Sequence, residues 1–157
     1  MSLRTGELSR RFFDLEIYAI YRAIWELWGE DAWKVVWRAG EIAFDELEGG
    51  LNLEGATWPE ALRKLGDYLQ EAGYVERITL RQTGDDEFEY EMVNPAILPG
   101  AKRLIAEGAV PAHISTSLMF AALKKRFGLK AEMIGDPDLL PDGRGIERWK
   151  VSKIKGR

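Results

Sequence analysis

The chain has 157 residues, which is enough for one domain with a substantial core. Hydrophobic residues make up 46% and charged residues 31%, which excludes collagen-like, disulfide-scaffold and wholly disordered chains. The chain has no cysteine and one histidine, His113, so disulfides, thiolate nucleophiles, cysteine-ligated metals and two-histidine relays are excluded. A net charge of -4 argues against a nucleic-acid surface, because duplex affinity comes largely from phosphate neutralisation.

The sequence predicts a cytoplasmic protein. The opening segment Met-Ser-Leu-Arg-Thr-Gly-Glu does not lead from a basic region into an uninterrupted apolar stretch, so no signal peptide is expected. The most apolar segment, residues 17–37, is interrupted by charged side chains, which predicts no membrane span.

Three helices are predicted in the first half of the chain. Apolar residues recur at steps of three and four over residues 7–29 and again over residues 31–50, which is the helical period. The segment Thr57-Trp-Pro-Glu60 is a capping box with proline in the first turn, and it predicts a helix that stops at Gly73.

The period then changes to two, which predicts a β-hairpin over residues 77–81 and 87–92 with a turn at 83–86. Arginines should face glutamates on its outer side, and Phe88, Tyr90 and Met92 should point inward. A short helix should end near Gly108.

The last third is predicted as a helix followed by two strands. Pro111 should open the helix and Gly128 should end it. Strands are expected at about 129–134 and 146–152, separated by a solvated loop over 135–145.

Motifs that would indicate an enzyme or a metal site are weak. The Asp-rich loop after Gly135 does not place ligands at EF-hand spacing, and Gly143-Arg-Gly145 lacks the third glycine of a dinucleotide fingerprint. His113 beside Ser115 or Ser117 does not by itself form a nucleophile pair, so a structural or pocket-lining histidine is favoured. One imidazole could also be an axial haem ligand, but no second element of a haem site is recognisable.

The tryptophans Trp25, Trp28, Trp33 and Trp37 are the least ordinary feature. Aromatic residues at helical spacing favour core or interface packing, but the same residue types build apolar ligand pockets.

A winged helix is a third interpretation of the helix–hairpin order. Its recognition helix, residues 62–73, would have a net charge of -1, counting the flanking Glu60, where DNA binding favours basic groups.

The order of segments resembles the 4-vinyl-reductase or hydrocarbon-binding domain, whose fold is shared with small subunits of the TRAPP vesicle-tethering complex. The resemblance covers about residues 33–152, and the segments that carry it are Ala39-Gly40-Glu41, Pro59-Glu-Ala-Leu62, Leu69-Gln-Glu-Ala-Gly73-Tyr74, Val110-Pro-Ala-His113, Leu118-Met-Phe-Ala-Ala-Leu123 and Gly128-Leu-Lys-Ala-Glu132.

This resemblance implies an α+β domain with helices packed on a four-stranded antiparallel sheet around an apolar pocket, commonly as a homodimer. The chain would be one domain over 1–157, with an added N-terminal helix at 7–29, a hydrocarbon-binding-like core at 31–152 and a basic tail at 153–157. Zinc-binding members carry cysteines where Ala112 and Arg148 stand here, so no metal and no cofactor are expected.

The leading hypothesis is non-enzymatic binding or sensing of a small hydrophobic or aromatic ligand by a homodimer, with no catalytic residues. The ligand would lie between the second helix, the hairpin and the helix after Pro111, and His113 would orient it. The expected lining residues are Trp33, Trp37, Tyr74, Phe88, Tyr90, His113, Met119 and Phe120. The alternatives are an interaction scaffold without a ligand and a winged-helix regulator; the sequence does not name the ligand or the pathway.

Overall fold

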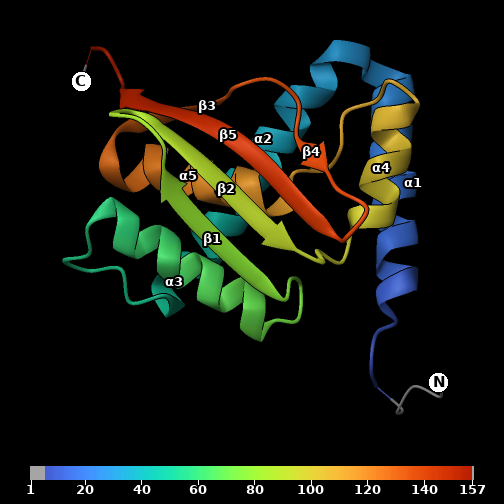
Figure 1. Ribbon diagram of the computed structural model, residues 1–157, viewed down its shortest axis with the longest axis horizontal. Helices are drawn as coiled ribbons and strands as arrows, with labels where there is room; N and C mark the ends of the chain where they lie inside the picture. The colour runs from blue at the N-terminus through green and yellow to red at the C-terminus, as the bar shows by residue number, and fades with distance from the viewer. Residues whose placement is uncertain (1–5, 157) are drawn as a thin grey trace.

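The computed structural model describes residues 6–156 and packs helices against one face of an antiparallel sheet (Figure 1). The predicted α+β class is confirmed. The helices are α1 (Arg10–Trp28), α2 (Ala32–Leu47), α3 (Trp58–Glu71), α4 (Leu98–Ala106) and α5 (Ile114–Phe127), with short 3-10 turns at Gly29–Asp31 and Glu48–Gly50. The strands are β1 (Arg77–Gln82), β2 (Glu87–Val93), β3 (Leu129–Met133), β4 (Asp138–Leu139) and β5 (Arg144–Lys153).

The sheet has five strands within the described residues, where four were predicted. Its order is β1-β2-β5-β3, and the short β4 also pairs with β5. The extra strand comes from the predicted loop, because Asp138 and Leu139 pair with Ile146 and Gly145 as the chain turns back into β5. Two residues are too few to show an alternating pattern in the sequence.

Local signals place most helix ends as predicted. The capping box at the start of α3 is present, and the Thr57 backbone N–H donates to the Glu60 carboxylate at 2.8 Å. Gly128 ends α5 in the left-handed conformation. The first helix begins at Arg10 rather than residue 7, because the Ser9 side chain caps it by accepting from the backbone N–H of Phe12.

The hairpin has the predicted polar and apolar faces. Arg81 lies 2.7 Å from Glu89 and Arg77 lies 3.7 Å from Glu91 on the outer face. Phe88, Tyr90 and Met92 are buried on the inner face. The winged-helix interpretation required the last strand to pack apart from the hairpin, and it is wrong because β5 pairs along the whole length of β2.

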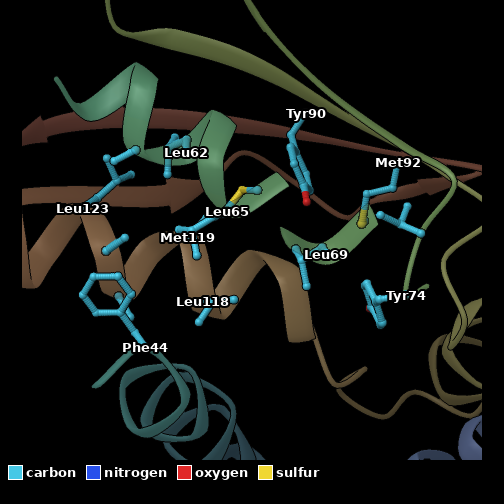
Figure 2. Packing of buried hydrophobic residues seen from close by; sticks show 14 of the residues in the cluster. Phe44, Leu62, Leu65, Leu69, Tyr74, Tyr90, Met92, Leu118, Met119 and Leu123 are labelled. Carbon is cyan, nitrogen blue, oxygen red and sulfur yellow. The ribbon is translucent and has the colours of Figure 1, made fainter. Parts of the chain in front are cut away.

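The core lies between the sheet and the helices, with α5 at its centre. Figure 2 shows Leu62 and Leu65 of α3 on one side of α5, next to Met119 and Leu123. Phe44 of α2 approaches α5 from the other side, and all five side chains are buried. Burial of this apolar surface supplies the main driving force for folding. No helix within residues 6–156 combines the length and the apolar character needed to cross a membrane.

The close packing of α2 on α5 depends on Gly40. A Cβ atom at this position would overlap the backbone C and O of Ser117. Glycine is therefore required because of the approach of two backbones, not because of its own dihedral angles.

We predict that Gly40→Ala lowers the free energy of unfolding by about 1–3 kcal/mol, because the two helices must separate to admit the methyl group. Urea denaturation followed by circular dichroism measures this change. Gly49→Ala is the matched control, since nothing lies within 4 Å of a Cβ at that position. Equal losses in both variants would contradict the proposed overlap.

Candidate functional site

An open cleft of about 830 Å³ lies between α2, α5 and β3. Its wall is mainly apolar and includes Trp33 and Trp37 from α2 and Phe120 from α5. The opposite wall comes from alternate residues of β3 and from the chain after β5: Leu129, Ala131, Met133 and Ile154. Charged side chains stand around it: Glu41, Lys124, Lys130, Glu132 and Asp136.

The aromatic wall depends on the helical spacing of its two tryptophans. Trp33 and Trp37 are one turn apart on α2, and their rings stack with centroids 5.5 Å apart and planes inclined by 18°. The ring of Trp37 stacks in turn on Phe120 at 5.3 Å and 19°. The three rings are nearly parallel and stack in series along this wall of the cleft.

Charged pairs at the cleft are largely neutralised. Glu41 accepts from Lys124 at 2.7 Å and from Arg38 at 3.0 Å. The hydrogen bond from Lys124 is the main cause that lowers the pKa of the Glu41 carboxyl. Both cations are more than half exposed, so these pairs add little stability and can rearrange around a bound molecule.

His113 lies at the start of α5, directly behind the tryptophans. The prediction that Pro111 opens this helix is wrong: α5 begins at Ile114, and the His113 carbonyl accepts its first helical bond, from the Ser117 N–H at 2.8 Å. His113 itself has a left-handed backbone with φ of 46°, which turns the chain into the helix. Its imidazole stacks on Trp33 at 5.5 Å and on Trp37 at 6.1 Å.

A buried carboxylate, Glu147, joins the start of α5 to β5. Its Oε1 lies 3.1 Å from His113 Nδ1, while its Oε2 accepts from the Thr116 hydroxyl at 2.6 Å and from Trp149 Nε1–H at 3.1 Å. Thr116 is three residues after His113 on the helix, and Trp149 is two residues after Glu147 on the strand. Both spacings put the partners on one face of their element.

Burial by itself would raise the pKa of Glu147. The hydrogen bond and charge of His113, with the donors on Thr116 and Trp149, outweigh this effect and hold the pKa of the Glu147 carboxyl below its usual range. The group is therefore a carboxylate at neutral pH, although its side chain is only 3% exposed. A fully bonded carboxylate is stable in the interior, whereas one missing a donor is costly.

The other predicted site residues lie away from the cleft. Tyr74 and His113 border a small cavity of about 40 Å³. Tyr90 stacks on Trp149 at 4.6 Å in the core, and Met119 is buried below it. Phe88 packs edge-on against Trp58 at 5.1 Å.

The eight predicted residues therefore do not form one pocket. Trp33, Trp37 and Phe120 line the cleft, while the hairpin residues contribute to the core instead. Within residues 6–156, none of the cleft residues comes from β1 or β2. The sheet face carrying Tyr90 is covered by helices. The strand that lines the cleft is therefore β3, at the edge of the sheet away from β1.

Two features of the site were missed from the sequence. Glu147 was not singled out, although it occupies the same strand face as Trp149, where a charged residue requires a buried partner. The sequence predicts a strand at about 129–134 but not which surface its residues Leu129, Ala131 and Met133 line. No group of three or more acidic or histidine side chains in the described chain is placed to hold a metal ion.

The fold is similar to that of solved heme proteins. No protein-family model matches the chain, and no curated protein matches it. A structure from work on heme distortion in the H-NOX family aligns with a TM-score of 0.57 at 13% identity, over 99% of this chain and 77% of that chain. A structure from work on heme redox potential and porphyrin distortion gives 0.53 at 11% identity, over 95% and 78% of the two chains. A substituted variant of Tt H-NOX gives 0.53 at 14% identity, over 100% and 80%. At these identities the similarity shows a shared fold.

We predict that Glu147→Gln removes about 2–4 kcal/mol from the free energy of unfolding at neutral pH, because the buried donors lose their charged acceptor. The folded-state pKa of Glu147 is lowered, so its contribution is present above the pKa of an unfolded glutamate, about 4.3, and is lost as the pH falls through the folded value. Below about pH 4 the wild-type protein should therefore lose stability more steeply than the variant. Urea denaturation from acid to neutral pH measures both slopes, with the exposed Glu46→Gln as control. Parallel slopes for wild type and Glu147→Gln would contradict this assignment.

Proposed function

We propose that the chain binds a small apolar or aromatic molecule in the cleft between α2, α5 and β3, and that it does so without catalysing a reaction. The observation that carries this proposal is the stack of Trp33, Trp37 and Phe120 along a cleft of about 830 Å³. This volume lies within the range of small-molecule sites, which are mostly apolar with a few polar groups.

His113 has a different role in this proposal from the one expected. It does not line the cleft; it packs behind the two tryptophans that do. The polar groups that could orient a ligand are instead Glu41, Lys124 and Ser117, which line the cleft beside the aromatic wall. His113 holds the tryptophan rings in place from the side of the core.

A heme, the group named for the similar structures, does not fit the residues present. His113 is the chain's single histidine; its Nδ1 lies 3.1 Å from Glu147, and within the described residues its buried Nε2 has no hydrogen-bond partner, but Trp33 and Trp37 stack on the ring. The cavity that it borders holds about 40 Å³, far less than a porphyrin needs. Among the described residues that line the larger cleft, Met133 is the one of a type that ligates heme iron, and methionine does so as the partner of a histidine, which this lining does not contain.

The buried polar groups also give no support to an enzyme. Thr116 and His113 each bond to Glu147, whose lowered pKa makes it a weak base, and all three side chains are buried. The resemblance to hydrocarbon-binding domains supports the same ligand class as the cleft does. The homodimer and the cytoplasmic location expected from the sequence stay predictions, as does membership of that family.

The interaction scaffold without a ligand is the competing function. It predicts a packed interior and an apolar contact surface with no cavity, which makes the open aromatic cleft the feature that distinguishes the two proposals. Native mass spectrometry of the purified protein, before and after denaturation, would identify a compound carried through purification. A bound hydrophobic molecule of low mass is the expected result.

We predict that the fluorescent aromatic probe 8-anilinonaphthalene-1-sulfonate binds in the cleft and that Ala131→Trp weakens its binding by roughly tenfold or more, about 1.4 kcal/mol. Ala131 lines the cleft and is partly exposed, so the larger ring should fill the space without disturbing the core. Fluorescence titration measures the affinity.

Trp37→Ala should weaken probe binding to a similar extent, because it removes the central ring of the wall. Trp28→Ala is the matched control, since Trp28 is 56% exposed at the end of α1, outside the cleft. Unchanged affinity in Ala131→Trp, with the fold intact by circular dichroism, would overturn the proposed site.

A further inference from the structure

Helix α1 carries an apolar face that the rest of the chain does not cover. None of its residues is buried, and Phe12, Leu15 and Leu27 are 53%, 51% and 72% exposed. In Figure 1 this helix lies at the edge of the molecule, beside α4 and outside the helices that cover the sheet. Exposed apolar surface gathered along one element marks an interaction site more often than scattered apolar residues do.

An adjacent face of α1 is held by polar contacts. Asp14 accepts from the Gly100 N–H at 3.0 Å, and Tyr18 and Arg22 bond to Glu107 at 3.0 and 2.5 Å. These residues recur every fourth position, so they fix the rotation of α1 about its axis. The apolar side is consequently held facing away from the domain.

Small residues lie at the middle of the apolar face. Phe12, Leu15, Ala19 and Ala23 follow one another at helical spacing, and all four are exposed. Two alanines one turn apart allow another helix to approach closely. If two such helices run antiparallel about a two-fold axis at Ala19, each Leu15 meets the Ala23 of the other copy, a large side chain against a small one.

The charges along α1 favour the antiparallel direction. Arg10 and Arg11 stand at its start, where with Arg103 they line a groove of about 660 Å³ between α1 and α4. The other end carries Glu26, whose Oε1 accepts from Arg22 at 2.7 Å, with Glu30 and Asp31 just beyond it. Arg11 and Glu26 lie about 12 Å and 10 Å from Ala19 along the axis, at a rise of 1.5 Å per residue.

An antiparallel pair thus brings the acidic end of each helix to the basic groove of the other copy. A parallel pair would place arginine beside arginine and glutamate beside glutamate. A membrane surface is a poorer occupant, because Glu16 and Glu26 interrupt the exposed side where a lipid-facing helix would be apolar or basic.

We infer that α1 is the contact surface of a two-fold symmetric dimer, in which it packs antiparallel on α1 of a second copy of this chain. The interface is isologous: Ala19 lies on the axis, Leu15 packs on Ala23, and Arg11 pairs with Glu26. This inference is independent of the ligand proposed for the cleft, since the α1 residues named here do not line it.

The mass in solution tests this inference directly. Sedimentation equilibrium of the full chain should give a dimer, and Leu15→Glu should raise the dissociation constant by roughly a hundredfold, because it buries a charge at the centre of the contact. Ile42→Glu is the matched control: Ile42 is equally exposed, at 51%, but lies on α2. A monomer at all concentrations overturns the inference, and so does a dimer that Leu15→Glu leaves intact.

A cross-link tests the position of the axis. The chain has no cysteine, so Ala19→Cys introduces a single thiol in each chain. The thiols of the two chains should lie next to each other at the two-fold axis. Mild oxidation should convert this variant to a covalent dimer, while Ile42→Cys should stay monomeric on a non-reducing gel. Equal cross-linking of both variants contradicts the axis at Ala19.

Charge reversal tests whether the two α1 helices run antiparallel. Arg11→Glu and Glu26→Arg should each weaken their own homodimer roughly tenfold, whereas an equimolar mixture of the two variants should pair as tightly as wild type. The mixed dimer restores both Arg–Glu contacts, one at each end. Single variants that dimerise like wild type would exclude the antiparallel arrangement, and co-sedimentation of a monomeric chain with phosphatidylserine vesicles would assign the face to a membrane instead.

Discussion

The carboxylate of Glu147 is the constraint around which the buried part of this protein is organised. It lies in the core, where an ionised group is stable only if its oxygens are bonded, and His113, Thr116 and Trp149 supply three polar partners. Two of the partners belong to the start of α5 and one to β5, so the network sets the position of the central helix along the sheet. Gly40 then sets how closely α2 can approach that helix, because the backbone at Ser117 leaves no space for a side chain.

This arrangement connects the cleft to the core through aromatic contacts. Trp37 touches both His113 and Phe120, and Phe120 packs edge-on against Trp149 at 4.9 Å. The wall of the cleft is therefore the outer layer of a packed aromatic cluster. A molecule bound against Trp33 would be separated from the buried carboxylate of Glu147 by the His113 ring.

The two surfaces that we propose to be functional lie on different elements. The cleft uses α2, α5 and β3, while the apolar face uses α1, which is attached mainly through α4. Ligand binding and pairing of two chains can therefore be altered by separate substitutions. At 13% identity, the similarity to a solved structure from work on heme distortion shows a shared fold only.

The local elements can be predicted from the amino-acid order, because the capping box at Thr57, the helix end at Gly128 and the alternation of the hairpin depend on residues within a few positions of one another. The same order also placed Trp33 and Trp37 on one side of a helix. Which surfaces these faces contact depends on long-range packing. Glu147 reaches His113 across 34 positions, and β5 enters the sheet between β2 and β3, so the inward face of the hairpin forms core while β3 lines the cleft. Alternation defines two faces of a strand, but strand order and helix coverage decide which of them is open.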